Sequence, residues 1–481
     1  MVTGFGVAAN PFAFLVLFGW PVVTALLFAR MPVERAAPWS LIAGYLLLPS
    51  GLEINPPLFP PIDKSSITVV STLVFCLAKG GLPRRRRGGI LLAVCGAMYI
   101  LAPIAATFNN SYELRIGSLS LPGFYPLDGI KGSIDNLIQV SAFYLGLRFL
   151  SSATGRAATL KIFVTAMLAY SVPILFELRL SPQLHRWVYG YDQFSFFDHM
   201  RWGGYRPVVF LPQGLQLALL IAMAVIGACF LARARIAVLR LPAWMPGAYL
   251  APFVILCKSL GAAIYAIALV PLALFARPSA CIRVASVLML FVCMYPALRS
   301  QRLAPIDSVL SISKDISRDR ANSFITRVKN EDRLLAKANQ KPLFGWGGWG
   351  RNRVYDSYGR DISITDGGWI IYYGMYGWFG YLGLFGLFIV PVFRLNHLIK
   401  QADQQEAKIA AALALMLAAN ILDMIPNANL TPITWIIAGS IARKAAFART
   451  RRKSDAPSAP SPLFQEQQLQ PSLSTTTAAV R

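Results

Sequence analysis

Residues 207–231 read PVVFLPQGLQLALLIAMAVIGACFL, a stretch that contains no charged side chain. A helix rises about 1.5 Å per residue, so about 20 apolar residues cross the hydrocarbon core of a bilayer. The stretch therefore predicts a transmembrane helix. It is too long for a strand and too apolar for the surface helix of a soluble domain.

Runs of similar character recur along all 481 residues, 56% of which are hydrophobic and 14% charged. We expect an all-α polytopic membrane protein with about 12–13 transmembrane helices. This composition excludes an ordinary cytosolic enzyme and a disordered scaffold. Two short runs, 246–257 and 259–276, form either two short spans or a re-entrant pair. The expected spans lie near 11–30, 38–51, 65–80, 89–107, 134–150, 159–177, 207–231, 246–257, 259–276, 283–298, 367–393, 408–424 and 430–443.

The formal net charge of +24 has a membrane explanation. Lys and Arg follow every second span, and cytoplasmic loops of membrane proteins are enriched in these residues. The pattern places the amino terminus outside and the carboxyl terminus inside. No basic domain of the kind that binds nucleic acid is present, so we expect no nucleic-acid partner.

Polar residues gather in the segments between the spans. Residues 1–298 are expected to hold ten transmembrane helices, with outer loops near 108–133 and 178–206, and residues 367–443 three more. Between them, residues 299–366 form a large outer loop that is expected to fold, with 13 Lys/Arg and 8 Asp/Glu. Its positive charge suggests an anionic partner at the outer membrane face. Residues 444–481 are basic, then rich in Pro, Ser and Gln, which predicts a disordered cytoplasmic tail.

The sequence offers no metal site and no cofactor motif. None of the six cysteines has CxxC spacing, and the three histidines show no metal-ligand spacing. The run Phe344–Arg351 (FGWGGWGR) formally contains G-x-G-x-x-G, but a dinucleotide site would need a strand before it and a helix after it. We therefore expect neither a metal nor a nucleotide cofactor.

The same run can instead form an aromatic turn. Trp346 and Trp349 could stack on a sugar ring, and Arg351 and Arg353 could grip phosphate. The alternative is that the tryptophans seat the loop at the bilayer interface. Just before it, residues 317–340 have helical composition and should end before Pro342.

Five charged side chains are further candidates. Arg327 and Glu331 form an i, i+4 pair on the 317–340 helix, which could also be an ordinary amphipathic helix on the membrane surface. Arg206 begins RPVVFLPQG at the outer end of a span, and Asp366 stands at the mouth of the span that follows it. Lys258 lies within an apolar stretch, where a charge marks a functional site unless it snorkels to the surface. Beyond Asp366, a glycine stripe runs from Gly374 to Gly386 at every third residue, typical of close helix packing.

Taken together, NEDRLLAKANQKPLFGWGGWGR (residues 330–351) and TDGGWIIYYGMYGWFG (residues 365–380) resemble the O-antigen ligase and polysaccharide polymerase superfamily. The resemblance covers most of the chain in topology and about residues 200–395 in local pattern. Arg206 matches the family's arginine before a span. Lys258-Ser-Leu-Gly-Ala stands where the family has a Ser-Arg-Gly-Ala-like turn. Asp366 takes the place of the ligase histidine that precedes a glycine, here Gly377.

The resemblance implies an enzyme of the bacterial inner membrane that acts at its periplasmic face on a polyprenyl-diphosphate-linked oligosaccharide. Because Asp366 replaces the ligase histidine, we expect a polymerase of O-antigen or exopolysaccharide, with an O-antigen ligase-type transferase as the alternative. Arg206 and Lys258, with Arg327 or Arg351, would stabilise the diphosphate leaving group. Asp366, with Glu331 second, would be the base, and the transfer would invert the anomeric centre.

The expected partners are then the lipid bilayer and, as a further candidate, a protein that regulates chain length. A flippase or transporter of lipid-linked sugar is the rival of another class. It should carry polar residues deep inside several spans, whereas the charged residues here concentrate toward one face.

Overall fold

The computed structural model describes residues 9–56, 59–80, 89–194, 199–201, 203–303 and 318–442. The predicted tail at 444–481, the basic run Arg84–Arg87 and part of the predicted outer loop lie outside the described residues. Among the described residues helices dominate, joined by two short antiparallel hairpins. The helices and strands are α1 Pro11–Arg30, α2 Val33–Leu47, α3 Lys64–Gly80, α4 Ile90–Phe108, β1 Leu114–Ile116, β2 Leu119–Leu121, α5 Pro126–Phe149, α6 Ala153–Leu180, α7 Leu184–Tyr189, β3 Met200–Arg201, β4 Gly204–Tyr205, α8 Gly214–Arg233, α9 Met245–Leu256, α10 Leu260–Phe275, α11 Pro278–Ser300, α13 Arg318–Ala338, α14 Gly368–Leu398, the 3-10 turn η2 Ile399–Gln401, α15 Gln404–Asp423 and α16 Pro432–Ile441.

Seven of the described helices are long and apolar enough to cross a bilayer: α1, α4, α6, α8, α11, α14 and α15. The chain is therefore a helical, multi-pass membrane protein, as its sequence predicts. The shorter apolar helices α9, α10 and α16 also coincide with predicted spans, so the count of 12–13 transmembrane helices stays a prediction. Helix α13 confirms the helix predicted over 317–340 and ends at Ala338, before Pro342.

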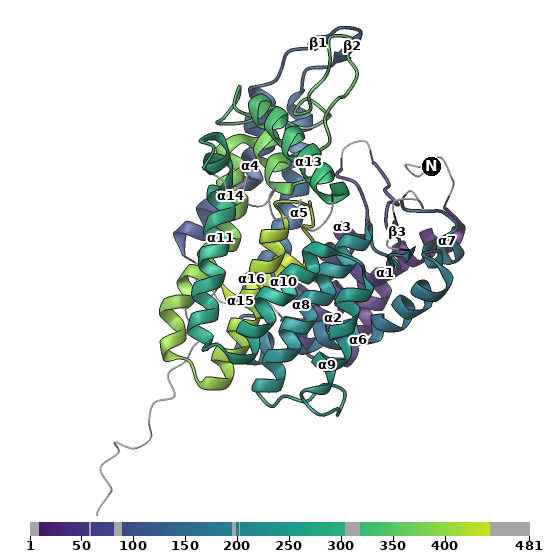
Figure 1. The fold of residues 1–481 in the computed structure, drawn as a ribbon, viewed down its shortest axis with the longest axis vertical. Coiled ribbons are helices and arrows are strands. Elements are labelled where there is room, and N and C mark those ends of the chain that lie inside the picture. The colour runs from purple at the N-terminus through teal and green to yellow at the C-terminus, as the bar shows by residue number, and fades with distance from the viewer. Residues whose placement is uncertain are drawn as a thin grey trace, which may run out of the picture. The chain divides into compact units, whose positions relative to one another are not determined.

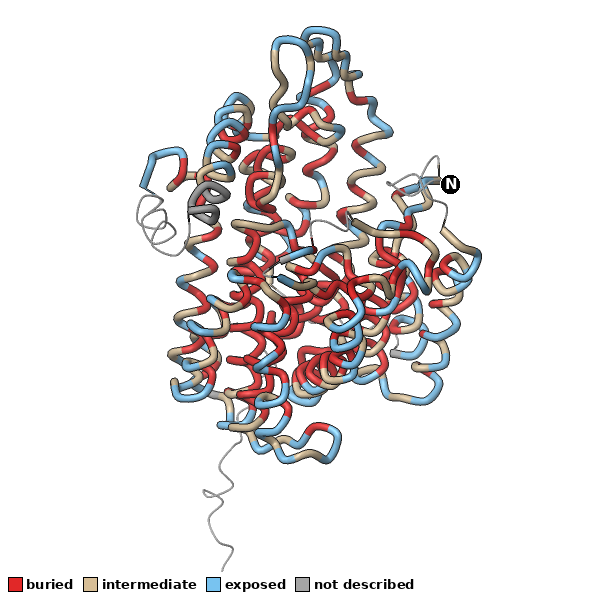
Figure 2. Tube along the Cα trace, turned by 45° about the vertical axis from the view of Figure 1, so that its right-hand side comes forward, coloured by how far each residue is buried: buried red, intermediate tan, exposed pale blue. Residues whose placement is uncertain are grey.

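Helices α8 and α15 lie at the centre of the bundle (Figure 1), and their residues are buried along almost their whole length. Figure 2 shows that the interior of the bundle consists of buried residues. Helix α8 packs against α6, α9, α10 and α15. Because α8 is apolar on all sides, it can be surrounded by other helices without burying unpaired polar groups.

Polar contacts join the ends of the central helices. Lys408 at the start of α15 donates to Arg233 O at the end of α8, and Arg233 donates to Ala273 O near the end of α10. A buried ion pair joins Arg156 at the start of α6 to Glu406. These contacts define one end of the bundle, which we call the short-loop end.

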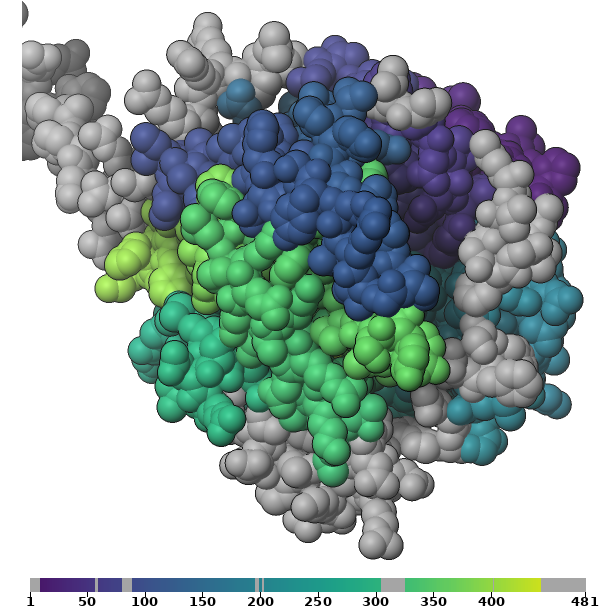
Figure 3. Space-filling model, turned by 90° about the horizontal axis from the view of Figure 1, so that it is seen from above, coloured from purple at the N-terminus to yellow at the C-terminus, as the bar shows by residue number. Residues whose placement is uncertain are grey.

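The opposite end carries the long connections, and we call it the loop end. There α15 finishes, α14 begins with Gly368 N donating to Asn427 O, and α9 meets α10 at Lys258. The hairpin β1–β2 and the segment 339–367 also lie at this end, and Ser118 Oγ joins them by donating to Tyr358 O. Figure 3 looks down on the loop end, where the blue and green residues of these segments adjoin.

Helix α14 is interrupted at Gly377, whose φ of 57° and ψ of −163° are not helical. The segment 342–347 lies against the break. Trp378 N and Phe379 N donate to Pro342 O and Leu343 O, while Trp346 N and Gly347 N donate to Gly374 O and Met375 O. A Cβ at position 377 would lie 2.5 Å from Leu343 backbone atoms, so only glycine fits there.

Beyond the break, the glycine stripe packs α14 against α4. A Cβ atom at Gly383 would lie 2.6 Å from Tyr99 N and 2.9 Å from Cys95 O. Neighbouring glycines of the stripe also face α4, at Ala102 and at the Cys95 side chain. The stripe therefore sets the distance between the two helices, as small residues do in membranes.

Replacing Gly383 with alanine should force α4 and α14 apart, because backbone atoms cannot move aside as a side chain can. We expect Gly383→Ala to lose about 1–3 kcal/mol of stability, measured as a lower thermal unfolding midpoint of the purified protein in detergent. Gly19→Ala is the matched control, since its Cβ meets no heavy atom within 4 Å. Equal midpoints for the two variants would contradict this account of the α4–α14 contact.

Candidate functional site

Arg206 and Lys258, which lie 52 residues apart in sequence, meet at the loop end. Arg206 Nη2 donates to Lys258 O over 2.8 Å. Lys258 Nζ lies over the β3–β4 hairpin, where a Cβ on Gly204 would come within 2.4 Å of it. We call this pair and its turn the cationic corner. It brings together two residues that the sequence singled out separately.

A buried polar network holds the segment that follows Arg206. Glu177 Oε2 accepts hydrogen bonds from Val208 N and Val209 N, at 2.7 and 2.8 Å. Tyr170 Oη accepts from Phe210 N, and Phe210 O accepts from Ser50 Oγ and Lys64 Nζ. Buried backbone groups need such partners because water cannot reach them. The network fixes the position from which Arg206 projects.

The backbone of the corner is strained. Val209 has φ 58° and Lys258 has φ 50°, in the left-handed region that L-residues avoid. For the β-branched Val209 this conformation is a clear outlier. Strain of this kind persists where surrounding contacts impose it, and it is concentrated at functional sites.

Asp366 and Arg327 also meet. Arg327 Nε lies 3.4 Å from Asp366 Oδ2, and both side chains are about two-fifths exposed, at 42% and 41%. Asp366 lies immediately before the N-terminal turn of α14, and Arg327 projects from α13. The pair leaves a carboxylate and a guanidinium open to a ligand at the loop end.

Glu331 lies one helical turn beyond Arg327. It faces Arg299 Nε at 3.7 Å, and Arg299 also contacts Asp332 at 3.1 Å. Burial raises the pKa of Glu331 to about 7, although the positive charge of Arg299 opposes the shift. A carboxyl with such a pKa can exchange a proton near neutral pH.

Asp423, at the end of α15, lies near the Arg327–Asp366 pair. Its carboxylate accepts hydrogen bonds from Asn427 Nδ2 and Asn429 Nδ2, at 2.9 and 2.6 Å. Arg327 and Tyr265 both lie close enough to interact with it. Tyr265 is on α10, whose first residue follows the Lys258 turn. Asp423 therefore lies near both the Arg327 guanidinium on α13 and the Tyr265 hydroxyl on α10.

Three other predicted site residues make structural contacts in the outer loop. Trp346 is buried, donates Nε1 to Lys337 O over 2.7 Å, and lies under the ammonium groups of Lys337 and Lys341. Arg351 is fully buried and donates to Pro122 O over 3.0 Å. Arg353 pairs with Asp361. Arg353 therefore holds the segment 339–367 together, whereas Trp346 and Arg351 attach it to α13 and to the residues after β2.

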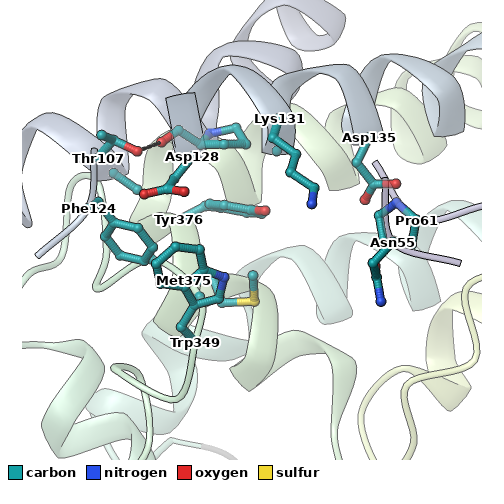
Figure 4. A pocket seen from close by; sticks show the side chains of 15 residues that line it. Asn55, Pro61, Thr107, Phe124, Asp128, Lys131, Asp135, Trp349, Met375 and Tyr376 are labelled. Carbon is teal, nitrogen blue, oxygen red and sulfur yellow. Dashed lines mark hydrogen bonds between the residues drawn. The ribbon is translucent and has the colours of Figure 1, made fainter. Parts of the chain in front are cut away.

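Trp349 instead lines a cavity of about 380 Å³ at the loop end. Its indole is 57% exposed and packs on Phe124, with ring centroids 5.0 Å apart. Figure 4 shows Lys131 extending from α5 between Tyr376 and Asp135. Other lining residues include Asn55, Thr107, Asp128 and Met375.

A second cavity, of about 260 Å³, adjoins the first and shares Pro61 and Asp135 with it. It adds Glu53, Asp63, Tyr372 and Trp435. The sequence analysis did not single out the charged residues of either cavity. For Asp128, Lys131 and Asp135 a signal was available, because their spacing places all three on one face of α5.

Glu177 tests how the cationic corner is held. Glu177→Leu leaves two buried backbone N–H groups without an acceptor, at a cost of about 1–3 kcal/mol each. We expect a lower thermal unfolding midpoint in detergent and faster proteolysis between residues 199 and 213. Glu113→Gln, which alters an exposed carboxylate, should change neither quantity. Wild-type behaviour of Glu177→Leu would show that the network does not hold the segment.

Comparison with known proteins adds no relative, since neither a family model nor a curated protein sequence matches the chain.

Proposed function

We propose that this chain is a polysaccharide polymerase of the bacterial inner membrane. It joins repeat units carried on polyprenyl diphosphate, at the outer face of that membrane. The observation that carries the proposal is the cationic corner, where Arg206 and Lys258 are fixed beside each other by a strained backbone and a buried network. Two positioned cations suit a leaving group that bears several negative charges.

The sidedness follows from the distribution of basic residues. Arg30, Arg233 and Arg277 lie at or next to helix ends on the short-loop end, where the connections are brief. Short basic loops remain in the cytoplasm, whereas long ones cross regardless of charge. The loop end would then face the periplasm, where lipid-linked repeat units are presented to the enzyme.

The reaction is a direct displacement. A sugar hydroxyl of the acceptor attacks the anomeric carbon of the donor, the new C–O bond forms, and the bond to diphosphate breaks. The electron pair of that bond leaves with the polyprenyl diphosphate, whose charge Arg206 and Lys258 stabilise. Attack from the face opposite the leaving group inverts the anomeric centre.

The hydroxyl proton passes to a carboxylate. Asp366 is the base in this proposal, because it is about two-fifths exposed and its partner Arg327 orients it. Glu331 stands second, because it is paired with Arg299 and less accessible. Asp423 is close enough to Arg327 to help hold the guanidinium in place.

The two adjoining cavities would bind the glycan. Aromatic rings pack on the apolar faces of sugars, and carboxylates accept hydrogen bonds from their hydroxyls. Trp349, Phe124 and Tyr376 supply the rings, while Asp128 and Asp135 supply the carboxylates. This arrangement assigns sugar binding to Trp349, whereas Trp346 supports the loop.

Loss of a cation from the corner should stop polymer synthesis. In a deletion strain complemented with Arg206→Ala, we expect long chains to be absent from a gel of surface polysaccharide while the protein is inserted at wild-type levels. Asp366→Asn should give the same result because the base is lost. Arg360→Ala, an exposed loop-end arginine paired with Asp356, is the matched control. Normal polymer in Arg206→Ala would refute the assignment.

The deletion strain also separates the alternatives. Single repeat units accumulating on carrier lipid at the outer face indicate a polymerase. Long chains that stay on the carrier lipid indicate a ligase-type transferase. Accumulation at the inner face indicates a flippase, and would move the function away from glycosyl transfer.

Trp349 provides a test of the glycan cavity. In a reconstituted assay, Trp349→Ala should raise the acceptor KM roughly 2- to 10-fold with little change in kcat, because one stacking surface is lost. Trp244→Ala removes another exposed tryptophan, just before α9, and should leave KM unchanged. A fall in kcat without any change in KM would place Trp349 outside glycan binding.

A further inference from the structure

A third and larger cavity lies at the opposite end of the bundle, away from the proposed reaction. It has a volume of about 900 Å³ and opens between α2, α6 and the connection from α8 to α9. Figure 1 shows α2, α6 and α9 side by side in this region, and α2 and α9 both pack against α6. Nothing in the proposed glycosyl transfer uses this cavity.

Cations from three separate elements line it. Arg35 projects from the first turn of α2, Lys161 from α6 and Arg240 from the connection before α9, and all three are exposed. No ion pair is formed by any of them within the described parts of the chain. Glu34 is the one carboxylate in the lining. The cavity is therefore positively charged, and its charges converge on a common space.

The start of α2 adds to this field. The helix begins at Val33 after Pro32, and no side chain caps it. Unpaired N–H groups at a helix N-terminus favour an anion. The cations and the helix terminus therefore attract the same kind of group.

Apart from Thr154 and Thr165, the rest of the lining is apolar. Trp39, Ile162, Ile236 and Leu239 contribute to the walls, and Leu239 is 58% exposed. An apolar wall beside a cationic rim matches the boundary between lipid headgroups and acyl chains, where tryptophan is also enriched. A small soluble anion has no acyl chain and would make no contact with such an apolar wall.

The backbone holds Arg240 in place. Leu239 and Arg240 are consecutive non-glycine residues with φ of 52° and 61°. Leu241 N donates to Val238 O over 2.9 Å, and Val238 is fully buried, which anchors the turn. An imposed strained turn at an exposed arginine is the kind of outlier that marks a binding site.

We propose that this cavity binds an anionic phospholipid of the leaflet at the short-loop end. Arg35, Lys161 and Arg240 contact the headgroup phosphate, and the acyl chains run along Trp39, Ile162 and Leu239. Basic pockets between helices on the cytoplasmic side of membrane proteins recognise anionic headgroups through the same chemistry. The site is independent of the glycan reaction at the loop end.

Native mass spectrometry of the full-length, delipidated protein in detergent tests the proposal. Titration with phosphatidylglycerol should show one tightly bound lipid, and phosphatidylcholine should bind at least about tenfold more weakly. Each neutralised cation should weaken phosphatidylglycerol binding about fivefold, so the triple variant Arg35→Gln/Lys161→Gln/Arg240→Gln should lose the tight site. Equal binding of the two lipids would overturn the proposal.

The matched control removes the same charge elsewhere. Arg115→Gln/Arg186→Gln/Arg360→Gln alters three exposed, ion-paired arginines at the loop end, and should leave the tight site intact. Loss of binding in this control would show that only net charge matters, which contradicts a built site.

Two further arms complete the test. Glu34→Gln removes the one opposing charge from the lining and should tighten phosphatidylglycerol binding, an effect that unfolding cannot produce. Weaker binding would contradict the proposed geometry. Inorganic phosphate at 10-fold excess should not displace the lipid, since phosphate lacks acyl chains to occupy the wall. Displacement would identify a simple anion site in place of a lipid site.

Discussion

The fold at the loop end depends on how the backbone of α14 is satisfied where the helix breaks at Gly377. A backbone group without a partner inside a membrane protein costs several kcal/mol, so a broken helix must be completed by other protein groups. Here the segment 342–347 supplies two carbonyls and two N–H groups to the break. This exchange binds the loop to the bundle, and it fixes the short first half of α14 that follows Asp366.

The same constraint governs the cationic corner. Val208, Val209 and Phe210 leave regular structure before α8 begins, and their backbone groups find buried partners on α6 and α3 and in the α2–α3 connection. In each place an irregular segment is held by polar contacts rather than by hydrophobic packing alone. Irregular, well-held backbone next to spanning helices is how membrane enzymes and transporters position charges. The proposal for Arg206 and Lys258 rests on that rigidity.

How much of the structure can be predicted depends on whether a feature is encoded in a local sequence pattern. Spanning helices are visible because a long apolar run has few other solutions. The run at 207–231 covers most of α8, which begins only at Gly214 and ends at Arg233. The break at Gly377 is hidden within a glycine stripe, in which Gly380, Gly383 and Gly386 pack against α4 as the pattern predicts. Arg351 illustrates a different limit. Its charge suggests a phosphate contact, but the tertiary fold buries it against Pro122 and the aromatic rings of Tyr112 and Phe124.

Pairs such as Arg206 with Lys258, or Arg327 with Asp366, depend on contacts between distant segments that no local pattern encodes.

The central claim is that the loop end breaks a glycosyl–diphosphate bond, and it is tested most directly by following that bond. Purified protein in liposomes would be supplied with a polyprenyl-diphosphate-linked repeat unit, and free polyprenyl diphosphate and glycan length would be measured together. We predict one polyprenyl diphosphate released for each repeat unit added. Movement of the intact donor between leaflets without release of polyprenyl diphosphate would contradict the account and identify a transporter.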